Sequence, residues 1–321
     1  MAGGTGTRLY PASRSDRPKQ FRAFGGDRSL LGRAVDRASF ADEIVVLTRD
    51  AFAERVREYA PDATVLVEPE PMNTGPALVF AAHRVRELFD DPVVLALPSD
   101  HVTGPGFADA ARRAVSVAAD EDALVTIGLK PTRPATEYGY IQPGDADEGV
   151  APVQQFREKP DAETAAEFVE AGYRWNVGTF AFRPVALLRE AADSPLSPLV
   201  DALAEDRPAD GFAAVEAASI DYAVLEDAGD VFVVLADFEW DDLGSWDALE
   251  RLLDGENAVI GDALTIDARG NVLATDDKHV SVVGADDLVV AAFDDRVLVV
   301  SREEAQRVRE VVSLLRERNA F

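Results

Sequence analysis

The sequence predicts an α/β fold with a largely parallel sheet, followed by a small all-β module. Short, nearly continuous apolar runs alternate with amphipathic helical patterns over roughly the first two thirds of the chain, as expected of strands covered by helices on both faces. After about residue 255, short apolar runs alternate with turns rich in Asp and Gly, which indicates a β module. Ligands of the α/β part are expected at the carboxyl ends of its strands.

The periodicity places these elements in order. Apolar runs predict strands at 44–47, 64–67, 93–97, 124–127 and 231–235. Apolar residues spaced three and four apart predict helices at 30–38, 51–59, 76–88 and 107–119. In the β module we expect strands at 264–266, 271–273, 280–283, 288–290 and 296–300, closed by one helix over 305–315. The two domains are therefore predicted to be residues 1–254 and 255–321.

A glycine-rich loop near the start of the chain carries the most specific signal. Gly3, Gly4 and Gly6 let the backbone turn sharply and present N–H groups to phosphate oxygens. Arg8 adds a forked donor and Lys19 a point charge, the usual pair for polyphosphate. The loop is neither a Walker A motif nor the Gly-x-Gly-x-x-Gly fingerprint of a dinucleotide fold.

A phosphate loop of this kind is expected after a β-strand, yet only Met1 and Ala2 precede Gly3. We expect the first strand of the fold to be missing before Gly3, with Met1 an internal methionine at the end of that strand.

The charge of the chain limits its partners. Its net charge of −27 argues against nucleic acid and anionic membranes. The acid is spread along the whole chain, and most cations are arginine. We expect a protein kept soluble at high salt, as in a halophilic archaeon; the alternative is an ordinary acidic cytosolic enzyme. The sequence holds no cysteine, no membrane-length apolar run and no signal peptide, so a cytoplasmic location without thiol catalysis is expected.

Carboxylates at two places are candidate metal ligands. Asp100 follows a strongly apolar strand, where a carboxylate suits Mg²⁺; capping of the next turn is an equal alternative from position alone. Asp241 and Asp242 follow the strand at 231–235 and could complete that site. From spacing alone, a solvated acidic turn is the better interpretation of this pair.

Polar residues in the middle of the chain are candidate sugar contacts. Glu158, Lys159 and Asn176 offer carboxylate, ammonium and amide groups for hydroxyls and phosphate; the alternatives are a surface ion pair and a turn. Gly139 lies between two tyrosines and could hold a ring, although aromatic pairs are more often core.

Asn73 and Thr74 precede a helix and a proline. The plain interpretation is an N-cap, which is compatible with contact to a base edge.

Together these segments resemble the sugar-nucleotide pyrophosphorylases, and within them the mannose-1-phosphate guanylyltransferase (GDP-mannose pyrophosphorylase) family. The matching segments occur in order along almost the whole chain: 2–9, 18–21, 68–69 with 73–74, 98–101, 137–141, 156–160, 175–178, 219–226 and 240–246. The Pro-Lys-Gln-Phe, Asn-Thr and Ser-Ile-Asp-Tyr segments point to the mannose and GDP branch.

The resemblance implies a Rossmann-like, GT-A-like nucleotidyltransferase domain over 1–254, with a mixed sheet flanked by helices. It implies a left-handed β-helix-like module over 255–321. The implied reaction is GTP plus mannose 1-phosphate giving GDP-mannose and diphosphate, by Mg²⁺-assisted in-line attack on the α-phosphorus. A homodimer is compatible with the family.

The resemblance also assigns roles to individual residues. It implies that Arg8 and Lys19 are catalytic and that Asp100 and Asp242 bind Mg²⁺. The implied nucleotide contacts are Gly3, Gly4, Gly6, Asn73 and Thr74. The implied sugar-phosphate contacts are Gly139, Glu158, Lys159, Asn176 and, more weakly, Asp221.

Three alternatives remain open from the sequence. The same chemistry could act on glucose 1-phosphate with dTTP or UTP. A non-catalytic homologue could bind sugar nucleotide as a regulatory subunit, although it need not keep Arg8, Lys19, Asp100 and Asp242. A glycosyltransferase would typically carry Asp-x-Asp on the central strand, where this chain has Ser-Asp-His.

Overall fold

The structure is a computed structural model and describes residues 1–4, 6–253, 255–318 and 321. It divides into two compact units. Unit 1 comprises residues 1, 37–98 and 103–240, and unit 2 comprises residues 2–36, 99–102 and 241–321. Asp254, the last residue of the first predicted domain, lies outside the described residues, and the units do not follow the predicted boundary. The division at 254/255 therefore stays a prediction.

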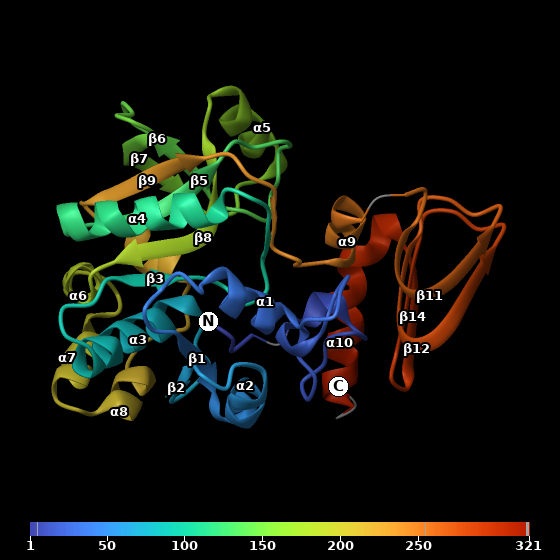
Figure 1. Ribbon diagram of the computed structural model, residues 1–321, viewed down its shortest axis with the longest axis horizontal. Helices are drawn as coiled ribbons and strands as arrows, with labels where there is room; N and C mark the ends of the chain where they lie inside the picture. Colours follow the sequence, from blue (N-terminus) through green and yellow to red (C-terminus); the bar gives the residue numbers. More distant parts are fainter. Residues whose placement is uncertain (5, 254, 319–320) are drawn as a thin grey trace. The chain divides into compact units, whose positions relative to one another are not determined.

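A six-stranded mixed sheet forms the centre of unit 1 (Figure 1). Its strands stand in the order β3-β8-β5-β9-β7-β6. Their bounds are β3 (Val94–Ala96), β5 (Leu124–Leu129), β6 (Tyr140–Pro143), β7 (Val150–Arg157), β8 (Arg174–Phe182) and β9 (Val231–Ala236). Because β8 runs antiparallel to both β3 and β5 while β5 and β9 are parallel, the largely parallel sheet expected from the apolar runs is wrong. The mixed sheet implied by the resemblance is confirmed.

Helices cover both faces of this sheet. The apolar face of α4 (Phe107–Glu121) packs on one side, where it contacts Val125 and Ile127 of β5. Leu124 of β5 and Val233 of β9 point to the opposite side, into the core formed with α3 (Thr74–Leu88) and α6 (Pro184–Ala192). The period of two along each strand thus sends alternate residues to two separate cores.

Unit 1 contains further strands and helices. A parallel pair, β1 (Val45–Arg49) and β2 (Thr64–Glu68), forms a separate two-stranded sheet. The other helices are α2 (Ala53–Tyr59), α5 (Ala162–Glu170), α7 (Ser197–Ala204), α8 (Pro208–Ala213) and a π-helix (Asp221–Leu225).

Three short elements span the division between the units. They are α1 (Leu30–Arg37), β4 (Val102–Thr103) and β10 (Trp240–Asp241).

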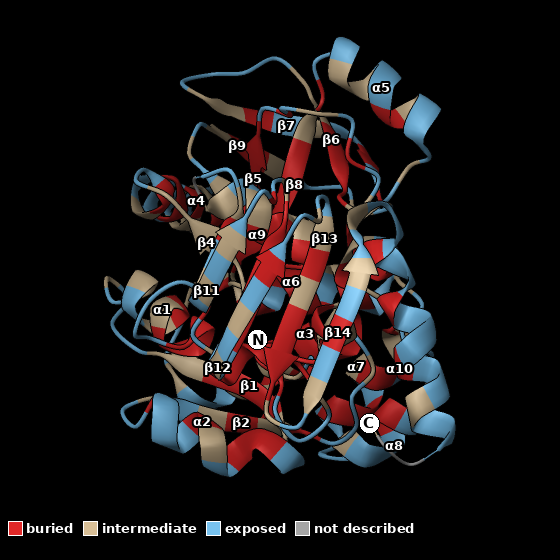
Figure 2. Cartoon of the chain, turned by 90° about the vertical axis from the view of Figure 1, so that its right-hand side faces the viewer, coloured by how far each residue is buried: buried red, intermediate tan, exposed pale blue. Residues whose placement is uncertain are grey.

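Unit 2 contains the C-terminal β module. Its four strands are β11 (Ala258–Ile266), β12 (Val272–Val283), β13 (Leu288–Phe293) and β14 (Arg296–Ser301). The first three pair in parallel and β14 returns antiparallel. Figure 2 shows β13 buried along most of its length, whereas the edge strand β14 is exposed only at alternate positions. A 3₁₀ turn (Arg302–Arg307) and α10 (Val308–Glu317) close the module.

The core of unit 2 joins this module to the start of the chain. Trp246 of α9 (Trp246–Leu252) is buried, and its indole N–H donates to the carbonyl of Tyr10 at 3.1 Å. Leu9 and Phe293 belong to the same core. The glycine loop is therefore followed by residues anchored on the C-terminal module.

Most of the strands and helices expected from periodicity are present, with ends shifted by a few residues. The expected strands at 271–273 and 280–283 are one continuous strand, β12. β8 was not expected, since Asn176 and Gly178 gave its segment the appearance of a turn. Within the described part of the chain, no helix combines the length and the apolarity needed to cross a membrane.

Candidate active site

The glycine loop leads into a 3₁₀ turn (Thr7–Leu9) in unit 2. Gly6 has φ +56°, in the left-handed region, and a Cβ there would lie 2.8 Å from the Cγ of Lys19 and 2.9 Å from the Oγ of Ser13. Glycine is therefore required for two reasons: its backbone conformation and the close passage of the lysine. A Cβ at Gly4 would meet no atom within 4 Å among the described residues outside its chain neighbours, which leaves space there beside the loop.

Gln20 holds the loop in place. Its buried Nε2 donates to the carbonyl of Ala2 at 2.9 Å and to that of Gly4 at 3.1 Å. Sequence reasoning missed this role. The signal was present in the Lys19-Gln20 pair, but spacing does not reveal which way the amide points.

Lys19 joins two distant parts of the sequence. Its ammonium lies 2.8 Å from Oδ2 of Asp100 and donates to the carbonyl of Leu243 at 2.9 Å. Its backbone N–H donates to Ser13 Oγ at 2.9 Å. The lysine is buried, so both ends of this residue are fixed.

The ion pair controls the ionisation of Asp100. Burial alone would raise the pKa of this carboxyl, but the nearby Lys19 and His101 outweigh burial and lower the pKa to about 2. Asp100 is therefore an anion throughout the neutral range.

The side chains of Arg8 and Asp242 both come close to Gly244. A Cβ at Gly244 would come within 2.5 Å of Oδ2 of Asp242 and 3.0 Å of Nη2 of Arg8, and its N–H donates to Oδ1 of Asp242 at 3.0 Å. Among the described residues, Arg8 makes no ion pair. We call Gly6, Arg8, Lys19, Asp100 and Asp242 the Lys19 cluster.

The neighbouring Asp241 serves a different purpose. Its buried carboxylate accepts from Nε of Arg251 at 2.8 Å and pairs with Nη2 of the same residue at 2.7 Å. Burial raises the pKa of Asp241 against the opposing charge of Arg251. The two adjacent acids thus point to different partners, which favours Asp242 over Asp241 as the metal ligand.

The donor set fits a magnesium ion whose coordination is completed by substrate. Asp100 supplies an ionised carboxylate and Asp242 would supply a further carboxylate, and Mg²⁺ commonly binds one or two carboxylates together with phosphate oxygens and water. Among the residues that the structure describes, no group of three or more His, Asp or Glu side chains is arranged to hold a metal. Phosphate oxygens would therefore be needed to complete the site.

Unit 1 contains a second group of candidate residues, centred on Asn176 of β8. Its Nδ2 donates to Oδ1 of Asp221 at 2.9 Å, and its Oδ1 accepts from Oγ1 of Thr126 at 2.8 Å and from the N–H of Gly178 at 3.1 Å. Three bonds fix the orientation of the amide. Thr126 is fully buried on β5, and sequence reasoning missed it because it stands inside an ordinary apolar strand.

Gly139 and Glu158 are in close contact. A Cβ at position 139 would lie 2.6 Å from Oε2 of Glu158, and the Gly139 carbonyl accepts from the N–H of Asn176 at 2.9 Å. Glu158 is buried and pairs with the ammonium of Lys159, whose side chain is about half exposed. We call Gly139, Glu158, Lys159, Asn176 and Asp221 the Asn176 cluster.

The environment of Asp221 favours its protonated form. Burial, followed by the nearby Glu158 carboxylate, raises the pKa of Asp221 to about 7, and Lys159 and Asn176 oppose this only in part. The cluster therefore offers both a charged and a protonatable oxygen for hydroxyl groups.

Asn73 and Thr74 connect to the segment that carries Asp221. Asn73 caps α3 by accepting from the N–H of Thr74 at 2.8 Å, and its φ is +72°. Oγ1 of Thr74 accepts from the N–H of Ile220 at 3.0 Å. The structural interpretation of this pair as an N-cap is confirmed, and its contact with a base stays a prediction.

Two families of protein domains match this chain in succession. Residues 1–258 match the family described as nucleotidyl transferase, and residues 261–315 match the MannoseP isomerase/GMP-like beta-helix domain. All residues of the Lys19 cluster fall within the first match, whose family is a class of enzymes that transfer nucleotidyl groups. The chain belongs to the nucleotidyl transferase family and is an enzyme of that type.

Three similar proteins show which members of that class this chain resembles. The mannose-1-phosphate guanylyltransferase of Escherichia coli is 37% identical over 99% of this chain and 73% of its own length. The xanthan biosynthesis protein XanB of Xanthomonas campestris is 38% identical over 98% of this chain and 72% of its own length. A crystal structure of a protein named mannose-1-phosphate geranyltransferase, from Thermus thermophilus, has a TM-score of 0.92 at 35% identity and covers 98% of both chains.

Proposed function

We propose that this chain catalyses the reaction of GTP with α-D-mannose 1-phosphate to give GDP-mannose and diphosphate. The observation that carries the proposal is the Lys19 cluster, in which a buried lysine touches Asp100 and the carbonyl that follows Asp242. The names of two relatives, both mannose-1-phosphate guanylyltransferases, supply the substrates.

In the proposed reaction a phosphate oxygen of the sugar phosphate attacks the α-phosphorus of GTP in line. The new P–O bond forms as the bond between the α-phosphorus and the bridging oxygen breaks, and diphosphate leaves with that electron pair. The protein forms no covalent intermediate. Its task is to orient two anions and to stabilise charge on the phosphoryl oxygens.

The residues of the Lys19 cluster provide that positive charge. Arg8, which lacks an ion pair among the described residues, would bind the β- and γ-phosphates through its forked donors. Lys19 would neutralise the departing diphosphate, and the open side of the loop at Gly4 would admit phosphate oxygens to backbone N–H groups. Bound at Asp100 and Asp242, Mg²⁺ would supply further positive charge to the phosphates.

The residues of the Asn176 cluster would bind the sugar. Glu158 and Asp221 would accept hydrogen bonds from mannose hydroxyls, while Asn176 keeps its fixed orientation between Thr126 and Asp221. Lys159, whose side chain is about half exposed, would reach the sugar phosphate. Asn73 and Thr74 would lie near the guanine.

We further propose that the enzyme works at high salt in the cytoplasm. The net charge of −27 favours solubility and repels both anionic substrates, so local cations and Mg²⁺ must overcome that repulsion. A homodimer stays a prediction, which the hydrodynamic mass in high salt would test.

The test is diphosphate release in high salt with Mg²⁺. GTP, dTTP, UTP, ATP and CTP are each assayed against mannose 1-phosphate and glucose 1-phosphate. We expect release to be highest with GTP and mannose 1-phosphate. Release that peaks with dTTP or UTP and glucose 1-phosphate would keep the mechanism and replace the substrates. No release from a folded protein with any pair would contradict catalysis and favour the regulatory homologue.

A further inference from the structure

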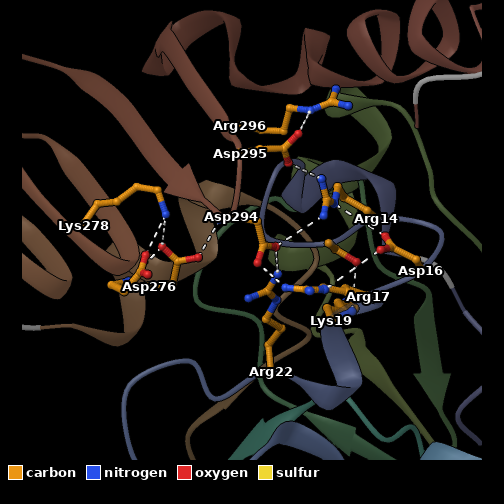
Figure 3. A network of polar contacts seen from close by, with 12 residues as sticks. Arg14, Asp16, Arg17, Lys19, Arg22, Asp276, Lys278, Asp294, Asp295 and Arg296 are labelled. Atoms are coloured by element: carbon orange, nitrogen blue, oxygen red, sulfur yellow. Dashed lines mark hydrogen bonds and ion pairs between the residues drawn. The ribbon is translucent and has the colours of Figure 1, made fainter.

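The turn between β13 and β14 carries an acidic tip that meets three arginines from the start of the chain. Figure 3 shows Arg14, Arg17 and Arg22 directed toward Asp294. Nη2 of Arg22 lies 2.7 Å from Oδ2 of Asp294 and Nη2 of Arg14 lies 3.5 Å from the same oxygen. Arg17 pairs with the other oxygen. One carboxylate is therefore shared by three guanidinium groups, all within unit 2.

The acidic tip is itself held in a fixed conformation. Asp294 has φ +52°, a left-handed conformation that Asp tolerates better than most residues. Its backbone N–H donates to Oδ2 of Asp276 at 2.6 Å, and Asp276 also accepts from Lys278. The preceding Phe293 is buried, and the Arg22 guanidinium lies 5.2 Å from the centre of its ring.

These arginines lie on both sides of Lys19 in the sequence, and their backbone hydrogen bonds hold the segment around it. The N–H of Arg22 donates to the carbonyl of Lys19 at 2.9 Å, and Arg14 and Arg17 exchange two backbone hydrogen bonds that close a turn just before the lysine. Ser13, next to Arg14, accepts the N–H of Lys19. The segment is thus fixed by Asp294 through its flanks and by Asp100 through its lysine.

Burial decides which of these pairs persist in salt. The side chains of Arg14, Arg22 and Asp294 are 12%, 18% and 20% exposed, whereas that of Arg17 is 46% exposed. Charges in full contact with solvent are screened over about 3 Å at 1 M salt, and partly buried pairs are screened much less. Both Arg14 and Arg22 are thus partly buried against Asp294, and the Arg22–Asp294 pair, at 2.7 Å against 3.5 Å for Arg14, is the contact best able to hold the segment at high salt.

We infer that Asp294 is a positioning residue for Lys19: the C-terminal β module holds the segment 14–22 so that the lysine reaches its place between Asp100 and the Leu243 carbonyl. The inference rests on the proposed function, because Asp294 acts only through Lys19. It gives the C-terminal module an indirect part in catalysis, through the position of Lys19, in addition to its structural part.

The experiment compares Asp294→Asn with Asp287→Asn in the full chain. Asp294 and Asp287 both have a left-handed backbone conformation, with φ +52° and +54°, which Asn also tolerates. Each substitution removes one negative charge. The carboxylate of Asp287 lies 3.6 Å from Arg302, outside the segment 14–22, so this variant is the matched control.

Turnover and hydrogen exchange are measured together. Displacement of a catalytic group by about 1 Å can cost as much as 10²-fold in rate, so we expect Asp294→Asn to lower kcat about tenfold. The KM for mannose 1-phosphate should stay within about twofold, because that ligand is assigned to the Asn176 cluster. Backbone amides of the segment 14–22 should exchange faster in Asp294→Asn and unchanged in Asp287→Asn.

Three results would overturn the inference: exchange in the segment equal to that of the wild type, faster exchange with unchanged kcat, or an equal loss of kcat in Asp287→Asn. If Asp294→Asn does not fold, Arg17→Gln replaces it, since this half-exposed side chain makes one of the same contacts; we expect smaller effects in the same directions. Should the wild type turn over no substrate pair, the proposed function fails separately. In that case, the slowing of backbone hydrogen exchange in the segment 14–22 by GTP replaces turnover as the measurement. Equal slowing in the wild type and the variant would overturn the positioning role.

Discussion

Asp100 in the Lys19 cluster and Asp221 in the Asn176 cluster are the same residue type in opposite electrostatic surroundings. The pKa of Asp100 is held at about 2 because Lys19 and His101 outweigh the effect of burial. The pKa of Asp221 rises to about 7 because burial and the Glu158 carboxylate act together. The first carboxyl is an anion throughout the neutral range, and the second gains and loses its proton near neutrality. This contrast separates handling of phosphate charge from recognition of hydroxyl groups.

Of the substitutions that test this contrast, removal of Lys19 should have the largest effect on activity. In Lys19→Ala, the transition state loses a buried positive charge, and we expect kcat to fall about 10²–10³-fold, the effect of losing one strong electrostatic contact. Steady-state diphosphate release measures this loss. Lys130→Ala, an exposed lysine of unit 1, is the control and should stay near wild type. Near-normal turnover of a folded Lys19→Ala enzyme would remove the lysine from the mechanism.

Two adjacent acids can sharpen the assignment of the metal site. Asp242→Asn should raise the Mg²⁺ concentration needed for half-maximal rate by at least about tenfold, the low end of losses seen when metal sites are altered. Asp241→Asn removes the charge that faces Arg251 and should instead lower the free energy of unfolding by about 1–3 kcal/mol. Titration of Mg²⁺ and chemical unfolding of both variants separate these outcomes. An equal shift in Mg²⁺ dependence for Asp241→Asn would reassign the ligand.

The raised pKa of Asp221 gives a test by pH. The ordinary value is 3.8 and the folded value is about 7, so the folded state retains a proton that the unfolded state releases between these limits. Relative to Asp221→Asn, the wild type should therefore lose stability as pH rises from about 4 to about 7, and change little above that range. Free energies of unfolding at pH 5 and pH 8 for both proteins measure the difference. A difference that does not depend on pH would contradict the buried, proton-holding carboxyl.

The smallest effect is expected at Thr126, which acts on the sugar cluster through Asn176. Thr126→Val removes the hydroxyl at nearly constant shape, and the loss of one hydrogen bond worth about 1 kcal/mol should raise the KM for mannose 1-phosphate about fivefold. Thr126→Ser keeps the donor and serves as the control. We expect its KM to remain near wild type, and a matching rise in both variants would assign the effect to packing.

Elements with strong periodicity were predictable from the sequence, and buried polar pairings were not. The helix α4 was predicted because its apolar residues recur at helical spacing and all pack against one face of the sheet. β8 was not predicted because Asn176 and Gly178 are residue types common in turns. In the structure, Asn176 is held in the sheet by its hydrogen bonds with Thr126 and Asp221. Tertiary contacts overrode local preference at this strand.

The candidate site shows the same limit. The Gly-rich loop and its cations could be recognised as a motif, but the 2.8 Å contact of Lys19 with Asp100 joins residues that are distant in the chain. Likewise, sequence spacing could not show that Asp241 faces Arg251 while Asp242 faces Gly244. Side-chain direction at consecutive positions depends on the fold of both partners, which no local pattern contains.

The passage of the Lys19 side chain beneath Gly6 restricts how this enzyme can be re-engineered. Any β-carbon at position 6 would collide with the methylene groups of the lysine and with Ser13. A library that diversifies the loop at this position would therefore select for compensating changes at 13 and 19, and the proposed catalytic cation would be among the first groups lost. Position 6 can change only together with positions 13 and 19, so substitutions that alter nucleotide selectivity should be sought elsewhere in the chain.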